Sequence, residues 1–156
     1  MFKYIINSSP IISLSKAGLI FILDNFDIII PTGVFDEIQS DKHADEAKRF
    51  IQNNENKVYD KYIISQELFS WNLGKGETSV IAIAMTMPES IVVLDDGKAR
   101  KCAKLYDLKT TGTIGLVLLA KEYGFIRNVS DAILSLKNAG LYLSDELIQS
   151  VLNSNG

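Results

Sequence analysis

Residues 91–100 read Ile-Val-Val-Leu-Asp-Asp-Gly-Lys-Ala-Arg, and this stretch decides how the chain folds. The β-branched apolar run over 91–94 predicts a buried strand. Two carboxylates, Asp95 and Asp96, end this strand, and a glycine and a helical pattern follow. One of the acids can cap the new helix by accepting from its free N–H groups. The other needs a different explanation, because functional groups of parallel sheets collect just past the carboxyl ends of strands.

The composition is that of an ordinary globular domain. With 156 residues, of which 47% are apolar and 22% charged, the chain can form one domain, over 1–156, with a substantial core. The net charge of -3 argues against a wholly basic nucleic-acid binder but leaves room for a local basic patch. Cys102 is the only cysteine, so no internal disulfide can form, and we expect a reducing, cytoplasmic setting.

The apolar N-terminal segment does not have the pattern of an export signal. Asn7, Ser8, Ser9 and Pro10 interrupt it early, and Lys16 interrupts it again. No apolar run approaches the roughly 18 residues that a membrane-spanning helix needs. We therefore expect no association with a membrane.

Short apolar strands alternate with helical segments along the chain. Strands are expected at 2–6, 27–30, 58–62, 91–94 and 108–110. An almost wholly apolar helix over 114–120 is expected to be buried on all sides. This order favours parallel pairing with right-handed crossovers. The fold class we infer is α/β, a three-layer α/β/α sandwich with a small central parallel sheet.

Oxygen-bearing side chains stand at several junctions between the expected elements. They are Asn7 after the first strand, Glu37 early in a helix, Glu77 opening a helix, and Asp95 and Asp96 after the central strand. If the first and central strands are neighbours, their ends meet. Clustered carboxylates repel one another unless they are protonated or bridged by a cation. Hard oxygen ligands select Mg²⁺ or Mn²⁺, and such a site can clamp a phosphodiester for hydrolysis.

Local helix chemistry offers a competing explanation for the same acids. An acid in the first turn of a helix complements the helix dipole by about 0.3–1 kcal/mol. That effect alone could account for Glu77 and for one of Asp95 and Asp96. Glu37 could be a solvated helix residue.

Five motifs in a fixed order resemble the PIN-domain superfamily, and most closely a PIN-like branch related to the VapC-type toxin ribonucleases. The resemblance covers nearly the whole chain. The motifs are Asn-Ser-Ser-Pro-Ile-Ile at 7–12, Pro-Thr-Gly-Val-Phe-Asp-Glu-Ile at 31–38, Gly-Lys-Gly-Glu at 74–77, Leu-Asp-Asp-Gly-Lys-Ala-Arg at 94–100 and Thr-Gly-Thr-Ile-Gly at 111–115.

The resemblance implies a metal-dependent endoribonuclease, the toxin of a type II toxin–antitoxin pair, that hydrolyses RNA with Mg²⁺ or Mn²⁺. It implies an RNA substrate, a small antitoxin protein as partner, and a homodimer.

The resemblance also assigns roles by position. Glu37 matches the second family acid, Glu77 the third, and Asp95 or Asp96 the last. Asn7 stands where the first family acid usually lies, so it could ligate a metal through its side-chain carbonyl without adding charge. Ser8 or Ser9 matches the small hydroxyl residue that helps to order the site.

Two further groups of residues have both a functional and a local explanation. Lys98, Arg100 and Lys101 could steer RNA phosphates, together with Lys104, or could simply form a solvated helix face. The segment from Thr111 to Thr113 opens a helix, so its N–H groups could hold a phosphate or serve only in capping.

The main rival hypothesis is a catalytically weakened PIN-fold module that binds RNA or a protein partner without cleavage. It follows from Asn7 in place of an acid. Apolar residues such as Ile20, Phe21 and Phe26 would then form a dimer or antitoxin surface. A receiver-like phosphoacceptor domain is disfavoured, because its acidic pair follows the first strand. The glycine fingerprint of dinucleotide-binding domains is absent.

Overall fold

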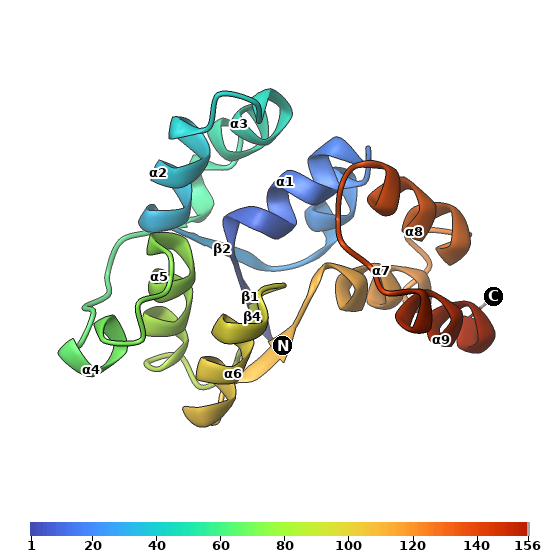
Figure 1. Ribbon diagram of the computed structural model, residues 1–156. Helices are drawn as coiled ribbons and strands as arrows, with labels where there is room; N and C mark the ends of the chain where they lie inside the picture. The colour runs from blue at the N-terminus through green and yellow to red at the C-terminus, as the bar shows by residue number, and fades with distance from the viewer. Residues whose placement is uncertain (156) are drawn as a thin grey trace.

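Five parallel strands form the centre of the protein, in the order β3-β2-β1-β4-β5. We describe a computed structural model that covers residues 1–155 (Figure 1). The strands are β1 (Lys3–Ile6), β2 (Ile28–Pro31), β3 (Val58–Tyr59), β4 (Ser90–Val93) and β5 (Lys109–Thr111). The α-helices are α1 (Ser8–Lys16), α2 (Thr32–Ser40), α3 (Asp45–Gln52), α4 (Gln66–Phe69), α5 (Lys75–Ala84), α6 (Gly97–Leu105), α7 (Thr113–Glu122), α8 (Val129–Asn138) and α9 (Asp145–Asn155), and two 3₁₀ turns cover Ile20–Asn25 and Glu55–Lys57.

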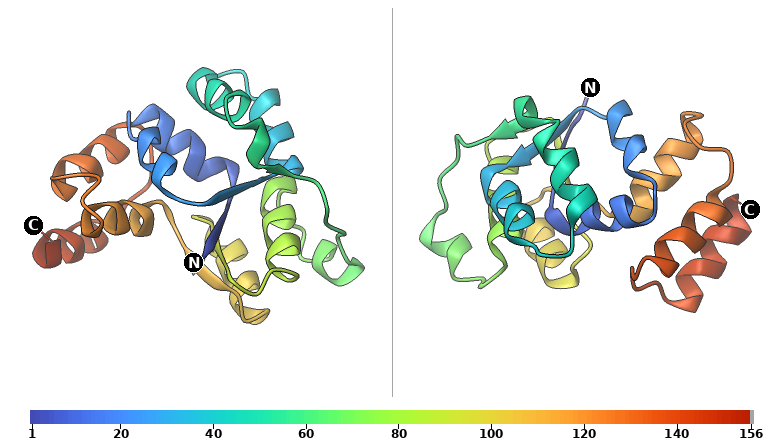
Figure 2. Two further views of the ribbon diagram at one scale, coloured as in Figure 1. Left: turned by 180° about the vertical axis from the view of Figure 1, so that it is seen from behind. Right: turned by 90° about the horizontal axis from the view of Figure 1, so that it is seen from above.

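Helices cover both faces of the sheet, which confirms the three-layer α/β/α architecture. Helices α5 and α6 lie on one face, and α1, α7 and α8 lie on the other (Figures 1 and 2). The chain moves from β1 outward to β2 and β3, and then returns past β1 to β4 and β5. The direction of winding therefore reverses between β1 and β4. Open α/β sheets place ligand sites at the carboxyl end of such a reversal.

Strand pairing confirms that the first and central strands are neighbours. Ile6 of β1 lies beside Val93 of β4, so both strands end at the same level. The N–H of Asn7 donates to the carbonyl of Val93 at 3.2 Å, and the N–H of Leu94 donates to the carbonyl of Thr111 at 2.9 Å. The residues that follow β1 and β4 are thereby held at one edge of the sheet.

The structure corrects several details of the expected elements. The third strand is only Val58–Tyr59, because Tyr62 leaves the sheet and its hydroxyl accepts from the N–H of Gly33 at 3.1 Å. Helix α7 is not buried on all sides, since Ile114, among others, is only partly covered. Within residues 1–155 no helix has the length and apolar character to cross a membrane.

Candidate functional site at the carboxyl edge of the sheet

Asn7 is a polar residue held inside the fold directly after β1. Only 5% of its surface is exposed, its backbone is extended, and its side chain makes no capping bond to α1. The Asn7 amide is therefore free of the local capping role that asparagine often has before a helix. Its side-chain oxygen points toward α5 and α2, as the contacts around Gly76 show.

Close packing of α2 against α5 positions Glu37. Gly33 lies one turn before Glu37 on the same face of α2. A β-carbon at Gly33 would stand 2.8 Å from Ser79 Oγ of α5, so only glycine permits this approach. Glu37 is then held in place by Ser8, whose hydroxyl donates to Glu37 Oε1 at 2.7 Å. Of the two serines, Ser8 is therefore the one that contacts Glu37, whereas Ser9 is exposed on α1.

Gly76 marks the point where oxygens from separate elements converge. A β-carbon at Gly76 would contact Glu37 Oε1 and would lie 2.7 Å from Asn7 Oδ1. Ser8 Oγ bridges the same pair, at 3.5 Å from Asn7 Oδ1. Side chains that follow β1 and that lie on α2 therefore meet over the first turn of α5, in a space that a methyl group would fill.

Glu77 opens α5 and has both a structural and an electrostatic role. Its Oε1 accepts from the N–H of Gly74 at 3.1 Å, which caps the helix. Burial raises the pKa of the half-buried Glu77 carboxyl above its ordinary value, and the carboxylates of Asp96 and Glu37 raise it further. The Gly74 hydrogen bond and Lys98 act in the opposite direction. The pKa of Glu77 therefore indicates that acids from α2, α5 and the end of β4 act on one another.

The two acids after β4 have different surroundings. Asp96 caps α6, because its Oδ2 accepts from the N–H of Ala99 at 2.9 Å. Its side chain is exposed at the carboxyl edge of the sheet, which we call the rim. Both oxygens of Asp95 are engaged by Thr113, Oδ1 by the N–H at 2.8 Å and Oδ2 by the hydroxyl at 2.6 Å. Asp95 thus ties the end of β4 to the start of α7. Within the described residues, the other oxygen of Asp96 accepts no hydrogen bond.

Arg100 departs from the solvated helix face on which its neighbours lie. It is half-buried, and its guanidinium donates to the carbonyl of Leu94 at 3.0 Å. A β-carbon at Gly112 would stand 2.7 Å from Asp95 Oδ1 and 3.1 Å from this guanidinium. Arg100 therefore stabilises the turn after β4 by binding the carbonyl of Leu94. Lys98 and Lys101 are exposed, as a phosphate-steering role or a solvated face would require.

The donor chemistry of this edge fits a hard divalent cation. Every candidate ligand offers oxygen, and Asn7 and Glu37 converge over Gly76. Within residues 1–155, however, no three acidic, histidine or cysteine side chains lie close enough together to hold a metal ion between them. One reason that no such group forms is that Asn7, which lies beside Glu37, has an amide where an acid would add a carboxylate.

Comparison with known protein families agrees with this geometry. The family model DUF3368, which describes a PIN domain, matches residues 3–156. The chain belongs to this PIN-domain family. No curated protein matches the sequence. PIN domains are generally nucleases, so membership indicates a nuclease-type function for this chain.

Sequence patterns of this PIN domain did not reveal three of the contacts that shape the site. Gly33 and Gly76 permit the α2–α5 approach, Thr113 binds Asp95, and Arg100 clamps Leu94. The position of Gly76 could have indicated close packing in advance. A glycine in the first turn of a helix lowers helix stability, so its presence there suggests that another group lies close to its α-carbon. The pairing of Asp95 with Thr113 carried no comparable signal, since it joins residues 18 positions apart in the chain.

Proposed function

We propose that this PIN domain is a metal-dependent endoribonuclease that hydrolyses RNA phosphodiesters with Mg²⁺ or Mn²⁺. The observation that carries the proposal is the convergence of Asn7 and Glu37 oxygens over Gly76, with Glu77 and Asp96 at the same rim. These groups come from α2, α5 and the ends of β1 and β4, where the winding of the sheet reverses. Helix capping explains the position of one oxygen on Glu77 and one on Asp96, but it does not explain why Glu37 and Asn7 converge over Gly76.

Asp96, and not Asp95, is the ligand that we propose for the end of β4. Both Asp95 oxygens are already engaged by Thr113, whereas one Asp96 oxygen is free and its charge acts on Glu77. Glu37 and Asn7 would complete the ligand set, together with Glu77. When bound, the cation would lower the pKa of water and offset the charge of the phosphodiester.

The remaining side chains have supporting roles in this proposal. Ser8 orients Glu37 through its 2.7 Å hydrogen bond. Asp95, Thr113 and Arg100 hold the turn that carries Asp96. Burial raises the pKa of the Glu77 carboxyl, and the carboxylates of Asp96 and Glu37 raise it further, so a cation bound beside these groups would offset their mutual repulsion.

The direct test is cleavage of labelled single-stranded RNA by the purified protein with Mn²⁺, with Mg²⁺ and with a chelator. We expect cleavage that requires the metal and that falls to background in Asp96→Asn and in Glu77→Gln. Both replacements keep an oxygen for the capping bond, so folding is preserved. Cleavage that survives in a chelator, or in both variants, would refute the proposal.

A non-catalytic role is the second candidate, and two observations favour it. Asn7 brings no charge to the site, and three close acids are missing from the part of the chain that the structure describes. In that case RNA would bind without being cut. Asn7→Asp would distinguish the two roles, because a weakened nuclease should gain cleavage from the added carboxylate and a binding module should not.

We also propose that the protein is the toxin of a type II toxin–antitoxin pair, in the cytoplasm, with a small antitoxin as partner. The order of the five sequence motifs supports this proposal. Phe26 cannot contribute to the expected partner surface, because it is buried against Tyr4, whereas Phe21 is 47% exposed. Expression of the wild-type chain, but not of Asp96→Asn, should arrest growth. A small reading frame beside the gene should encode a protein that relieves the arrest.

A further inference from the structure

A groove opens beside Asp95. It has a volume of about 420 Å³ and lies between the start of α7 and the loop that joins α8 to α9. Its lining includes the polar residues Asp95 and Arg100 as well as Leu141, Tyr142 and Leu147. The volume lies within the roughly 300–1,000 Å³ of pockets that hold small ligands.

This groove combines glycine backbone, which we call its floor, with apolar side chains and an aromatic ring. Gly112 and Gly115 line it. A β-carbon at Gly112 would stand 2.7 Å from Asp95 Oδ1, and one at Gly115 would contact the Thr111 hydroxyl, so packing excludes larger residues at both positions. Tyr142 is 88% exposed, which is unusual for a large ring with an apolar face. A planar ring could rest on the floor and stack against Tyr142.

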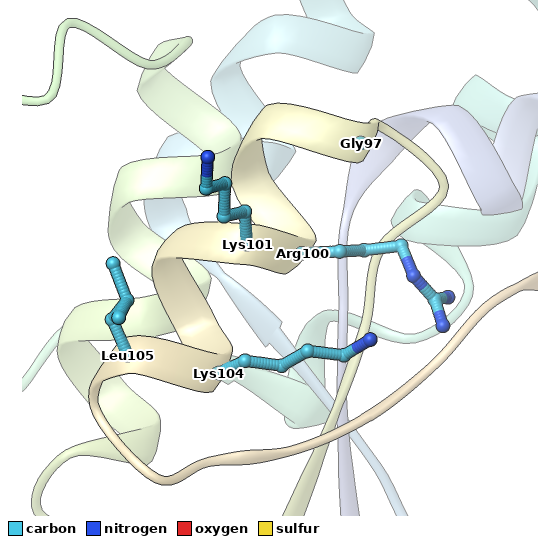
Figure 3. A pocket seen from close by; sticks show the side chains of 5 residues that line it. All are labelled: Gly97, Arg100, Lys101, Lys104 and Leu105. Carbon is cyan, nitrogen blue, oxygen red and sulfur yellow. The ribbon is translucent and has the colours of Figure 1, made fainter.

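Arg100 connects this groove to a basic one on α6. The basic groove is lined by Gly97, Arg100, Lys101, Lys104 and Leu105 (Figure 3). Figure 3 shows Arg100 and Lys104 extending to one side of α6, whereas Lys101 points to the other. Arg100 lines both grooves, and only one of its five N–H donors is committed to Leu94. A cationic groove thus adjoins an apolar, aromatic one across a single guanidinium.

We propose that the groove between α7 and the α8–α9 loop is a nucleobase pocket for the RNA strand, with Tyr142 as the stacking residue. A nucleotide has the matching pair of parts, a phosphate for the basic groove and a flat aromatic base for the apolar one. Arginine contributes to both, because its charge binds phosphate and its planar face stacks on bases. The inference rests on the proposed function, since it takes RNA as the substrate.

The charge of the adjoining basic groove favours a nucleotide over a protein partner. Arg100, Lys101 and Lys104 line that groove, and both lysines are exposed, although the chain as a whole carries a net charge of -3. A phosphate that entered the basic groove would meet these cations. The apolar groove is lined by Asp95, which directly precedes the proposed ligand Asp96 in the chain. A base bound there would belong to a nucleotide close to the scissile bond and would set the sequence preference of cleavage.

The test measures binding by the full-length Asp96→Asn protein, so that binding is separated from cutting. The probe is a fluorescein-labelled single-stranded RNA of mixed sequence, followed by anisotropy. Adding Tyr142→Ala should raise Kd by about five- to 150-fold, the range for losing one stacked base. Tyr142→Phe should keep the affinity, because it keeps the ring. Tyr142 is so exposed that neither change should disturb folding, which circular dichroism would verify.

Two controls separate base stacking from other effects. Phe69→Ala removes a ring that is 73% exposed on α4 and should leave Kd unchanged. An oligonucleotide of equal length made of abasic sites should bind more weakly to the parent, and Tyr142→Ala should then cause no further loss.

Two outcomes would overturn the inference, and a third would separate it from the proposed function. If Tyr142→Ala binds the mixed-sequence RNA as tightly as its parent does, the groove serves another ligand, a protein surface included. A parent that binds neither oligonucleotide also overturns it, while the cleavage assay judges the proposed function separately. Conversely, binding that depends on Tyr142 in a protein that never cuts RNA would refute the nuclease and leave the base pocket standing.

Discussion

Replacing Gly76 by alanine adds one methyl group where the oxygens of Asn7 and Glu37 converge. The new β-carbon would lie 2.7 Å from Asn7 Oδ1 and closer still to Glu37 Oε1, whereas ordinary contacts begin at 3.4 Å. Asn7 must therefore retreat by about 0.7 Å, and Glu37 by more. A misplacement of about 1 Å in a catalytic site costs roughly 10²-fold in rate, and we expect a loss of that size in RNA cleavage.

The same substitution should change stability much less than activity. Gly76 has ordinary helical backbone angles, so alanine adds roughly 0.5–1 kcal/mol of helix stability there. The hydrogen bond from Ser8 to the Glu37 carboxylate is weakened, at a cost of about 1.5–3 kcal/mol. The expected net loss is about 1–2 kcal/mol in urea denaturation, a change that leaves the protein folded.

Gly97→Ala is the matched control for Gly76→Ala. Gly97 opens α6 beside Asp96, and a β-carbon there would meet nothing within 4 Å. Gly97 also lines the basic groove, so the comparison is made at saturating RNA, where this variant should cleave with the wild-type kcat. If folded Gly76→Ala also cleaves at the wild-type rate, the oxygens above Gly76 take no part in the chemistry and our account of the site is wrong.

Further substitutions at the rim give distinct expectations. Asn7→Asp should lower the melting temperature without metal, because it adds a carboxylate beside Glu37, and should tighten Mn²⁺ binding in calorimetry; an unchanged affinity would show that Asn7 is not a ligand. Glu77→Gln should raise the melting temperature without metal at neutral pH. Folding raises the pKa of Glu77 above 4.5, so the charged Glu77 carboxylate lowers the free energy of unfolding. This loss is absent below about pH 4.5 and grows as pH rises through the folded pKa. The melting temperatures of the two proteins should diverge as pH rises above about 4.5, and parallel curves would contradict the raised pKa of Glu77, whose main cause is burial. Asp96→Ala should lose about 0.5–2 kcal/mol of unfolding free energy that Asp96→Asn retains, since only alanine removes the cap on α6; equal stabilities would mean that the 2.9 Å bond to Ala99 contributes nothing.

Local patterns predicted the elements of this PIN domain well, because local interactions form them. The apolar strand over 91–94 appears as β4, shifted by one residue, and Asp96 caps the following helix. Ser144 caps the last helix, as a serine before an amphipathic run predicts. Cys102 is a core residue, and burial raises the pKa of its thiol.

Patterns failed where a contact joins residues that are distant in the chain. Asp95 differs from Asp96 because it binds Thr113, and Thr113 lies within reach of Asp95 only because β5 pairs with β4. Arg100 looked like one charge in a basic helix face, yet it turns inward to the end of β4. Phe26 looked available to a partner and is instead buried against Tyr4.

Sequence patterns alone predicted the alternation of strands and helices, the layered α/β/α architecture and the oxygen-bearing residues at the ends of β1 and β4. Periodicity, turn residues and helix caps carry that information, because each acts within a few residues of chain. Which oxygens converge depends on packing between distant segments. Glu37 meets Asn7 because Gly33 and Gly76 let α2 and α5 approach. What packs beside the adjacent acids makes Asp96 an exposed helix cap and Asp95 a link between β4 and α7.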